Sequence, residues 1–345
     1  MPAAATSRSR RLTGLLILAA LLAVAALAGL VLGSRDLPLG TVYDALTCPG
    51  DWPLTCPAVG TDAEIVRQLR LPRTGLALAT GLALGMAGAL IQGYTRNPLA
   101  DAGLLGLNAG AAFLAALGIY LFGLTAPAQY IWFAFAGALL TGLVVFGVAS
   151  LGGGRAGPLS LVLAGAAMAA LLTALTNAIV LLDASALDTY RHWVVGTVAG
   201  HDASVLAQVL PFLLVGAALA VAATPGLNVL SLGDDVARGL GVHLARSRTL
   251  GLAAVVLLVG AATAAVGPIA FIGLIVPHIA RVFTGPDQRW LVPYSGLLGA
   301  LALLVADVIG RVVARPGEVQ AGVMVAALGA PFFVLLVRRR KLVSL

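Results

Sequence analysis

Nine long apolar runs constrain this chain more than any other feature. Each run is 18 to 24 residues long and carries few charges, and an α-helix of that length crosses the hydrocarbon core of a bilayer. Because lipid offers the backbone no hydrogen-bond partner, each run predicts a helix. The runs cover residues 12–33, 74–93, 104–123, 130–150, 159–182, 206–224, 247–266, 291–311 and 320–337.

A tenth, shorter apolar run extends from Ile269 to Val282 and contains Pro277. A membrane helix tolerates proline where packed neighbours satisfy the freed carbonyl, so this run predicts a short or bent span. The sequence therefore predicts an all-α integral membrane protein of about ten transmembrane helices. These form a single transmembrane domain over residues 1–345, with both chain ends on one side.

The composition supports a multi-pass protein of the cell membrane. Of the 345 residues, 60% are hydrophobic and 10% are charged, whereas soluble domains carry about 25% charged residues. The formal net charge of +7 does not indicate a nucleic-acid partner, because the arginines lie in short clusters between the apolar runs. Clusters of this kind orient a chain in a membrane.

The basic residues also predict the orientation. With the N-terminus in the cytosol, fourteen of the 21 lysines and arginines lie inside and seven outside, which predicts an N-in/C-in topology. Arg8, Arg10 and Arg11, in a basic cytosolic segment 1–11, also resemble the start of a signal peptide. The apolar run that follows them is longer than a usual signal core, which favours an uncleaved first span over a removed signal.

Two connections are too long to be simple turns. The outer connection, 34–68, contains Cys48 and Cys56, which either form a disulfide outside the cytosol, as we favour, or stay free thiols. No histidine or second cysteine pair suggests a metal site. The inner connection, 225–246, is either a docking surface or a solvated linker. A third segment, 188–200, predicts a short surface helix at the outer mouth.

Several motifs resemble one family. The stretch RLPRTGLALATGLALGMAGALIQGYTRNPLADAGLLG begins at Arg70, GPIAFIGLIVPHIAR begins at Gly267, ADVIGR begins at Ala306, and GAPFF begins at Gly329. Together with SLGDDVARGLGVHL in the inner connection, they resemble the FecCD-type permeases over roughly residues 60–341. Where that family shows Glu-Leu-Pro-x-Gly, this chain has Gln320 in place of the proline.

The resemblance implies a type II ABC importer permease that moves its substrate by alternating access. The expected assembly holds two permeases (a second copy or a sister chain), two cytosolic ABC ATPase subunits and an extracytoplasmic substrate-binding protein. The expected substrate is a ferric siderophore, with heme or cobalamin as alternatives from the same family. An ion-coupled secondary transporter is the alternative from another class, but such a protein would carry ionisable groups near the midplane, and this chain has only Asp307 near a membrane face.

The resemblance also implies docking residues on the outer face. Arg70, Arg73 and Arg311 match positions at which the family's arginines meet acidic groups of the binding protein. Guanidinium groups suit that task, because they form oriented, charge-assisted bonds to carboxylates. The alternative is that these arginines only reach toward lipid headgroups. Arg311 has a third possibility, since Asp307 lies four residues earlier on the same helical face.

Two further sets of residues follow from the resemblance. The residues expected to contact the ATPase lie in the inner connection: Asp235, Ala237, Arg238, Gly239, Leu240 and Gly241. The residues expected along the translocation path, between the fifth and tenth spans, are Gly329, Ala330, Pro331 and Phe332. The sequence contains no G-x-x-x-x-G-K-[ST] motif, so ATP is expected to be used by a partner subunit, and this chain is expected to be no enzyme and to bind no cofactor.

Overall fold

The computed structural model describes residues 8–47, 61–151 and 158–338, and every regular element in these ranges is helical. Cys48 and Cys56 lie outside the described residues, so their pairing stays a prediction. The elements are α1 (Arg8–Val31), α2 (Leu39–Thr47), α3 (Thr61–Glu64), η1 (Ile65–Arg70), α4 (Leu71–Thr95), η2 (Ala102–Leu105), α5 (Leu107–Phe122), α6 (Pro127–Leu151), α7 (Pro158–Leu182), α8 (Ala184–Val194), α9 (Ala203–Leu230), α10 (Asp234–Gly239), α11 (Leu244–Val266), α12 (Ile272–Thr284), α13 (Gln288–Val313) and α14 (Ala321–Arg338).

The predicted all-α membrane fold is confirmed. In the described ranges, seven helices are long and apolar enough to cross a membrane, and three shorter apolar helices accompany them. Each of the ten predicted runs falls on one of these ten helices, with the short tenth run forming α12. A short helix also lies at the predicted surface segment 188–200, but it is α8 over Ala184–Val194, so it begins and ends earlier than predicted.

Helix α4 is the centre of the bundle and packs against α13, α11, α9 and α12. Glycines allow this close packing. A Cβ atom on Gly85 would lie 2.0 Å from the carbonyl oxygen of Ser295 on α13, and one on Gly88 would lie 2.1 Å from that of Gly273 on α12. Only a residue without a side chain allows backbones to approach so closely, as in small-residue contacts of membrane helices generally.

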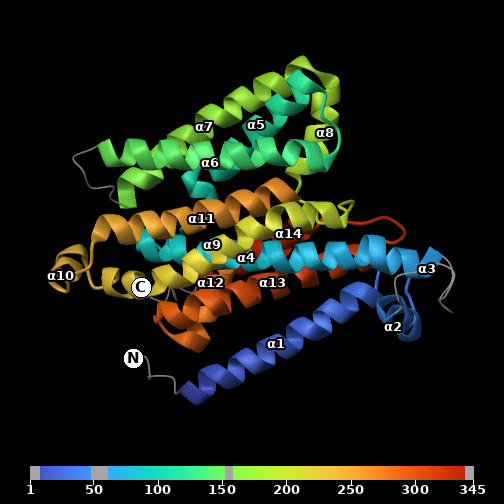
Figure 1. Cartoon of the computed structure of the whole chain (residues 1–345), viewed down its shortest axis with the longest axis horizontal. Coiled ribbons are helices and arrows are strands. Elements are labelled where there is room, and N and C mark those ends of the chain that lie inside the picture. Colours follow the sequence, from blue (N-terminus) through green and yellow to red (C-terminus); the bar gives the residue numbers. More distant parts are fainter. Residues whose placement is uncertain (1–7, 48–60, 152–157, 339–345) are drawn as a thin grey trace.

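The remaining helices surround this centre as separate layers (Figure 1). Helices α5 to α8 pack on one another beyond α11, and α1 lies along α13 on the opposite side. The start of α1, the end of α14 and the short helix α10 lie at one end of the bundle, whereas α2 and α3 lie at the other. This arrangement agrees with the predicted topology, in which the first span begins, the last span ends and the inner connection lies on the same side of the membrane.

Two predicted boundaries were wrong. Helix α9 continues through Pro225 to Leu230, so the inner connection covers 231–243 rather than 225–246. On the outer side, η1 continues directly into α4, and the two form part of one helical stretch over Asp62–Thr95. The predicted outer connection 34–68 therefore contains helical segments, because its last residues extend the next span.

Candidate functional site

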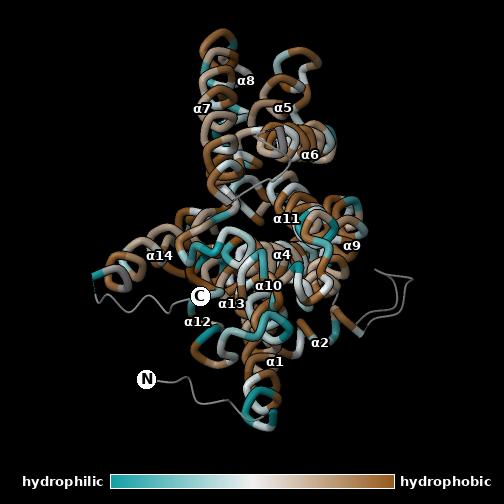
Figure 2. Tube along the Cα trace, turned by 90° about the vertical axis from the view of Figure 1, so that its left-hand side faces the viewer, coloured by the Kyte–Doolittle hydropathy of each residue, from teal (hydrophilic) through white to brown (hydrophobic). Residues whose placement is uncertain are grey.

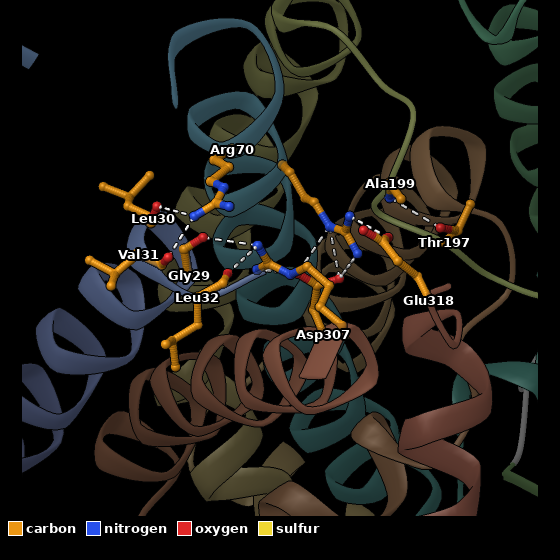
Figure 3. A network of polar contacts seen from close by, with 11 residues as sticks. Gly29, Leu30, Val31, Leu32, Arg70, Thr197, Ala199, Asp307 and Glu318 are labelled. Carbon is orange, nitrogen blue, oxygen red and sulfur yellow. Dashed lines mark hydrogen bonds and ion pairs between the residues drawn. The ribbon is translucent and has the colours of Figure 1, made fainter. Parts of the chain in front are cut away.

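The outer end of the bundle contains a buried cluster of charges around Asp307 (Figure 3). Asp307, on α13, is fully buried. Arg73, in the first turn of α4, donates to Asp307 from Nη2 at 2.7 Å and from Nε at 3.0 Å. Arg311, one turn further along α13, donates to the other carboxylate oxygen at 2.7 Å. The carboxylate of Asp307 thus joins α4 to α13, although Arg73 and Asp307 are 234 residues apart in sequence.

Arg73 extends this cluster to a third segment. Its Nη1 atom donates to Glu318 at 2.7 Å, and Glu318 lies in the short connection that leads into α14. The Arg73 side chain is only 12% exposed, whereas that of Glu318 is 34% exposed. The same guanidinium therefore has a buried partner below it and a more accessible partner at the surface.

Arg70 and Arg311 bind the end of α1 (Figure 3). Arg70 donates to the carbonyls of Leu30 and Val31, each at 2.7 Å, and Arg311 donates to those of Gly29 at 2.9 Å and Leu32 at 3.2 Å. The last four carbonyls of a helix have no partner within the helix, and cations near that end are favourable. These two buried arginines therefore cap α1.

A cavity of about 310 Å³ lies beside the cluster. His201 borders it from the connection before α9, and the Nδ1 atom of this buried ring has no hydrogen-bond partner. Burial lowers the pKa of His201. The charged residues that border the cavity are Arg35, Arg70, Arg73, Arg311 and Glu318.

The structure thus brings the three predicted docking arginines together. Arg70 and Arg311 are more than nine-tenths buried, and their donors already serve α1 and Asp307. Their contact with a binding protein stays a prediction. The Asp307–Arg311 pair was foreseen as one alternative from its spacing of four residues, whereas Arg73–Asp307 and Arg73–Glu318 were missed.

The inner end carries the short helix α10, which faces the viewer in Figure 2. Leu232, Val236 and Leu240 are 61%, 49% and 63% exposed, so large apolar side chains lie open before, on and after this helix. Asp235 is exposed as well and pairs with Arg238 at 2.5 Å. Gly239 and Gly241 lie at the exposed end of the connection, where Gly241 has a φ of +80°.

Ala237 differs from the other residues predicted to contact the ATPase. It is fully buried and belongs to the main hydrophobic core, so it packs α10 onto its own bundle and presents no surface to a partner. Leu232 and Val236 were not among the predicted contact residues. Only Val236 lies on α10, whereas Leu232 and Leu240 lie in the turns on either side, so the three exposed side chains form an apolar surface of the whole inner connection.

The four predicted path residues lie on α14. Gly329 is buried, and a Cβ atom there would lie 2.9 Å from the Cβ of Phe271, whereas Pro331 and Phe332 are exposed and Ala330 is partly buried. Figure 2 shows α7 and α14 as apolar helices that project from the centre. Their exposed apolar residues include Leu159, Leu163, Leu171, Val323, Leu328 and Leu335.

Among the described residues, no group of three or more His, Cys, Asp or Glu side chains could hold a metal ion.

Comparisons with known proteins give a consistent result. The family described as the FecCD transport family matches residues 21–339. The ferric enterobactin transport system permease protein FepD of Escherichia coli is 45% identical, with 97% of each chain covered. The cobalamin import system permease protein BtuC of Halobacterium salinarum is 36% identical, with 89% of this chain and 82% of that protein covered. A solved inward-facing conformation of a metal-chelate type ABC transporter is 27% identical, with a TM-score of 0.82 over 95% of this chain and 99% of the other.

Proposed function

The chain belongs to the FecCD transport family of permeases, and from this premise we propose that it imports ferric siderophores as one subunit of a larger complex. The observation that carries the proposal is the 45% identity to a ferric enterobactin permease over nearly the whole of both chains. The cobalamin permease is less similar, at 36%, which favours a ferric chelate over cobalamin. Heme and cobalamin remain the alternative substrates.

We further propose that a separate ABC ATPase drives this permease. The sequence has no P-loop, so the phosphates of ATP require another subunit. The exposed apolar surface of Leu232, Val236 and Leu240 supports a docking role for the inner connection, because exposed apolar residues on the cytosolic side of a membrane protein have no lipid to cover them. The exposed pair of Asp235 and Arg238 would fix the register of that contact.

A second permease would complete the path. Helices α7 and α14 carry exposed apolar residues along their length, as expected of surfaces that meet lipid or another helix bundle. In the proposed dimer, these two helices of each copy line the passage, and a mostly apolar lining would let a bulky chelate pass without tight binding. Alternating access of this passage would follow from closure of the ATPase subunits.

A binding protein would deliver the substrate to the outer end. The cavity beside the arginine cluster is cationic and open on one side, so it suits carboxylates of a docked protein. Ala199 borders this cavity without taking part in the charge cluster. An Ala199→Asp variant should weaken docking by charge repulsion, whereas the neutral Ala199→Asn variant should dock normally. Equal affinity of the two variants for the binding protein would overturn this docking site.

The alternative of an ion-coupled secondary transporter needs an ionisable group that is free to exchange a proton or ion. Asp307 is not such a group, because two guanidinium groups bind its carboxylate at one end of the bundle.

The experiment that tests the proposed function is purification of the chain from its native membrane in mild detergent, followed by mass spectrometry. We expect a P-loop ATPase and a substrate-binding lipoprotein to co-purify. A preparation that still transports without either partner would contradict the importer.

A further inference from the structure

We infer that Asp234 is the positioning residue that ties the ATPase-facing helix α10 to the transmembrane helices α4 and α11, so that movement of α10 moves the bundle. This inference rests on the proposed function, since it says how that function reaches across the membrane. Its basis is a single carboxylate at the inner end that binds two arginines from different helices.

Asp234 is the first residue of α10. One of its oxygens accepts a bond from Nη2 of Arg96 at 2.6 Å, and the other accepts one from Nη2 of Arg248, on α11, at 2.7 Å. The side chain of Arg248 is only 13% exposed, and that of Asp234 is 29% exposed. The two bonds therefore use both oxygens of the carboxylate, one with the mostly buried Arg248 and one with Arg96, whose side chain is 40% exposed.

Arg96, the first of these two partners, has an unusual backbone conformation. Arg96 follows the last residue of α4 and has a φ of +49°, which non-glycine residues seldom adopt. Its Nη2 atom donates to the carbonyl of Leu230, at the end of α9, at 2.7 Å, in addition to Asp234. Through Arg96 and Arg248, the carboxylate of Asp234 thus connects α10 with the ends of α4, α9 and α11.

The backbone can turn on both sides of α10. The chain enters the helix at Gly233, with a φ of +108°, and leaves it by Gly241, with a φ of +80°. Glycine allows such angles at little cost and permits the backbone to turn there. Ala237 packs inward, but a single methyl group does not fix the direction of a helix of six residues. Asp234 therefore sets the orientation of α10 against the bundle.

Helix α4 connects this contact with the opposite face. Arg73 lies in its first turn, and Arg96 follows its last residue, so the two arginines lie about 35 Å apart along a helix that rises about 1.5 Å per residue. Arg73 belongs to the outer charge cluster, and Arg96 binds Asp234. A push on α10 would reach the outer face through one continuous helix, and docking outside would reach α10 by the same route.

The carboxyl of Asp234 stays ionised at neutral pH. Burial acts to raise its pKa, but Arg248 and Arg96 together lower it below the usual value for aspartate. The link is therefore present over the whole physiological range and is not a pH sensor.

The test uses the complete importer, with the ATPase and the binding protein that co-purify with the chain, reconstituted in lipid nanodiscs. The readout is the factor by which the binding protein stimulates ATP hydrolysis, since this reports communication between the two faces without requiring a known chelate. We expect Asp234→Asn and Arg248→Gln to lower this factor about fivefold or more while the ATPase still binds and hydrolyses ATP, because coupling between sites typically corresponds to factors of that size.

Two further variants separate positioning from general damage. Arg248→Lys keeps a positive charge that can pair with Asp234 and should recover most of the stimulation. Arg289→Gln removes an exposed arginine from the same end of the protein and should match the wild type. If Asp234→Asn fails to assemble, the comparison of Arg248→Gln with Arg248→Lys decides the question.

Each outcome is distinct. Normal stimulation in Arg248→Gln, or equal loss in Arg248→Gln and Arg248→Lys, would overturn the role of Asp234 and leave the permease function intact. A wild-type chain that binds no ATPase would overturn the proposed function itself and this inference with it.

Discussion

The two ends of α4 use arginine–carboxylate bonds in opposite ways. At the outer end, Asp307 is fully buried, and the guanidinium groups of Arg73 and Arg311 both converge on it. At the inner end, Asp234 is partly exposed and holds a helix of only six residues, flanked by glycines with positive φ. The outer contact joins long helices to one another, whereas the inner contact joins a small element to long helices.

This difference suggests different mechanical roles. A buried ion pair whose partners come from rigid helices fixes one arrangement, because separating the pair leaves charges without solvent. A partly exposed pair on a six-residue helix holds that helix to the bundle and leaves its outer face open to a partner. The outer end is thus suited to hold a preformed surface for docking, and the inner end is suited to move with a partner.

The largest effect is expected from Asp307→Asn. The change leaves the buried guanidinium of Arg311 without a counter-charge and leaves Arg73 with Glu318 alone, and breaking a buried pair in this way costs about 3–5 kcal/mol. The thermal stability of the detergent-purified protein should fall sharply. The comparison variant is Glu318→Gln, whose partner Arg73 keeps Asp307 and whose own side chain is partly exposed, so its cost should stay below about 1 kcal/mol. Similar melting temperatures for the two variants would show that the outer cluster is not rigidly buried.

The next largest effect concerns the helix that joins both ends. In Gly88→Ala, the new methyl group would meet backbone atoms of Gly273 at 2.1 to 2.6 Å, so α4 and α12 must separate. Overpacking of this kind costs about 1–3 kcal/mol. Gly147→Ala on α6 is the control, because nothing lies within 4 Å of its Cβ position. Equal stability of the two variants, measured by thermal unfolding, would contradict the close packing of α4.

A smaller effect is expected at the inner surface. Leu240→Asp places a charge in the exposed apolar surface of the inner connection without disturbing the core, so the permease should fold normally. Its association with the ATPase should weaken about tenfold, a change of about 1.4 kcal/mol. The measurement is the concentration dependence of ATPase binding to the variant in nanodiscs. Unchanged binding would remove Leu240 from the proposed docking surface.

The smallest effect is expected from the exposed pair of Arg315 and Asp36, whose contact measures 2.5 Å. The bond from Arg315 lowers the pKa of Asp36 from its usual 3.8, so the pair stabilises the fold above that pH and loses its contribution as the pH falls through the lower folded value. Arg315→Gln should therefore melt slightly earlier than the wild type at neutral pH, and this difference should disappear in acid. A difference that persists in acid would mean that Arg315 acts through packing.

Much of the fold was predictable because lipid restricts the backbone to so few solutions. Each apolar run had to become a helix, and the Asp307–Arg311 pair followed from helical spacing. The sequence also placed the inner connection correctly, although its start was wrong at Pro225. Proline usually ends a helix because it lacks a backbone N–H donor, so the sequence alone does not show that α9 continues past Pro225.

The contacts between distant segments were not predictable. Nothing in the sequence pairs Arg73 with Asp307, or Arg96 with Asp234, because the partners are 234 and 138 residues apart. The burial of Ala237 was missed for a related reason. A six-residue helix has too few turns for its apolar pattern to show which face meets the bundle.

The central claim is that this permease moves a ferric chelate with energy from an ATPase partner. The most direct measurement is uptake of a ⁵⁵Fe-labelled ferric siderophore into proteoliposomes that contain the chain with its ATPase, with the loaded binding protein on the other side. The account predicts uptake that requires ATP and the binding protein and is unaffected when ion gradients are dissipated. Uptake that proceeds without ATP and follows an imposed ion gradient would contradict it.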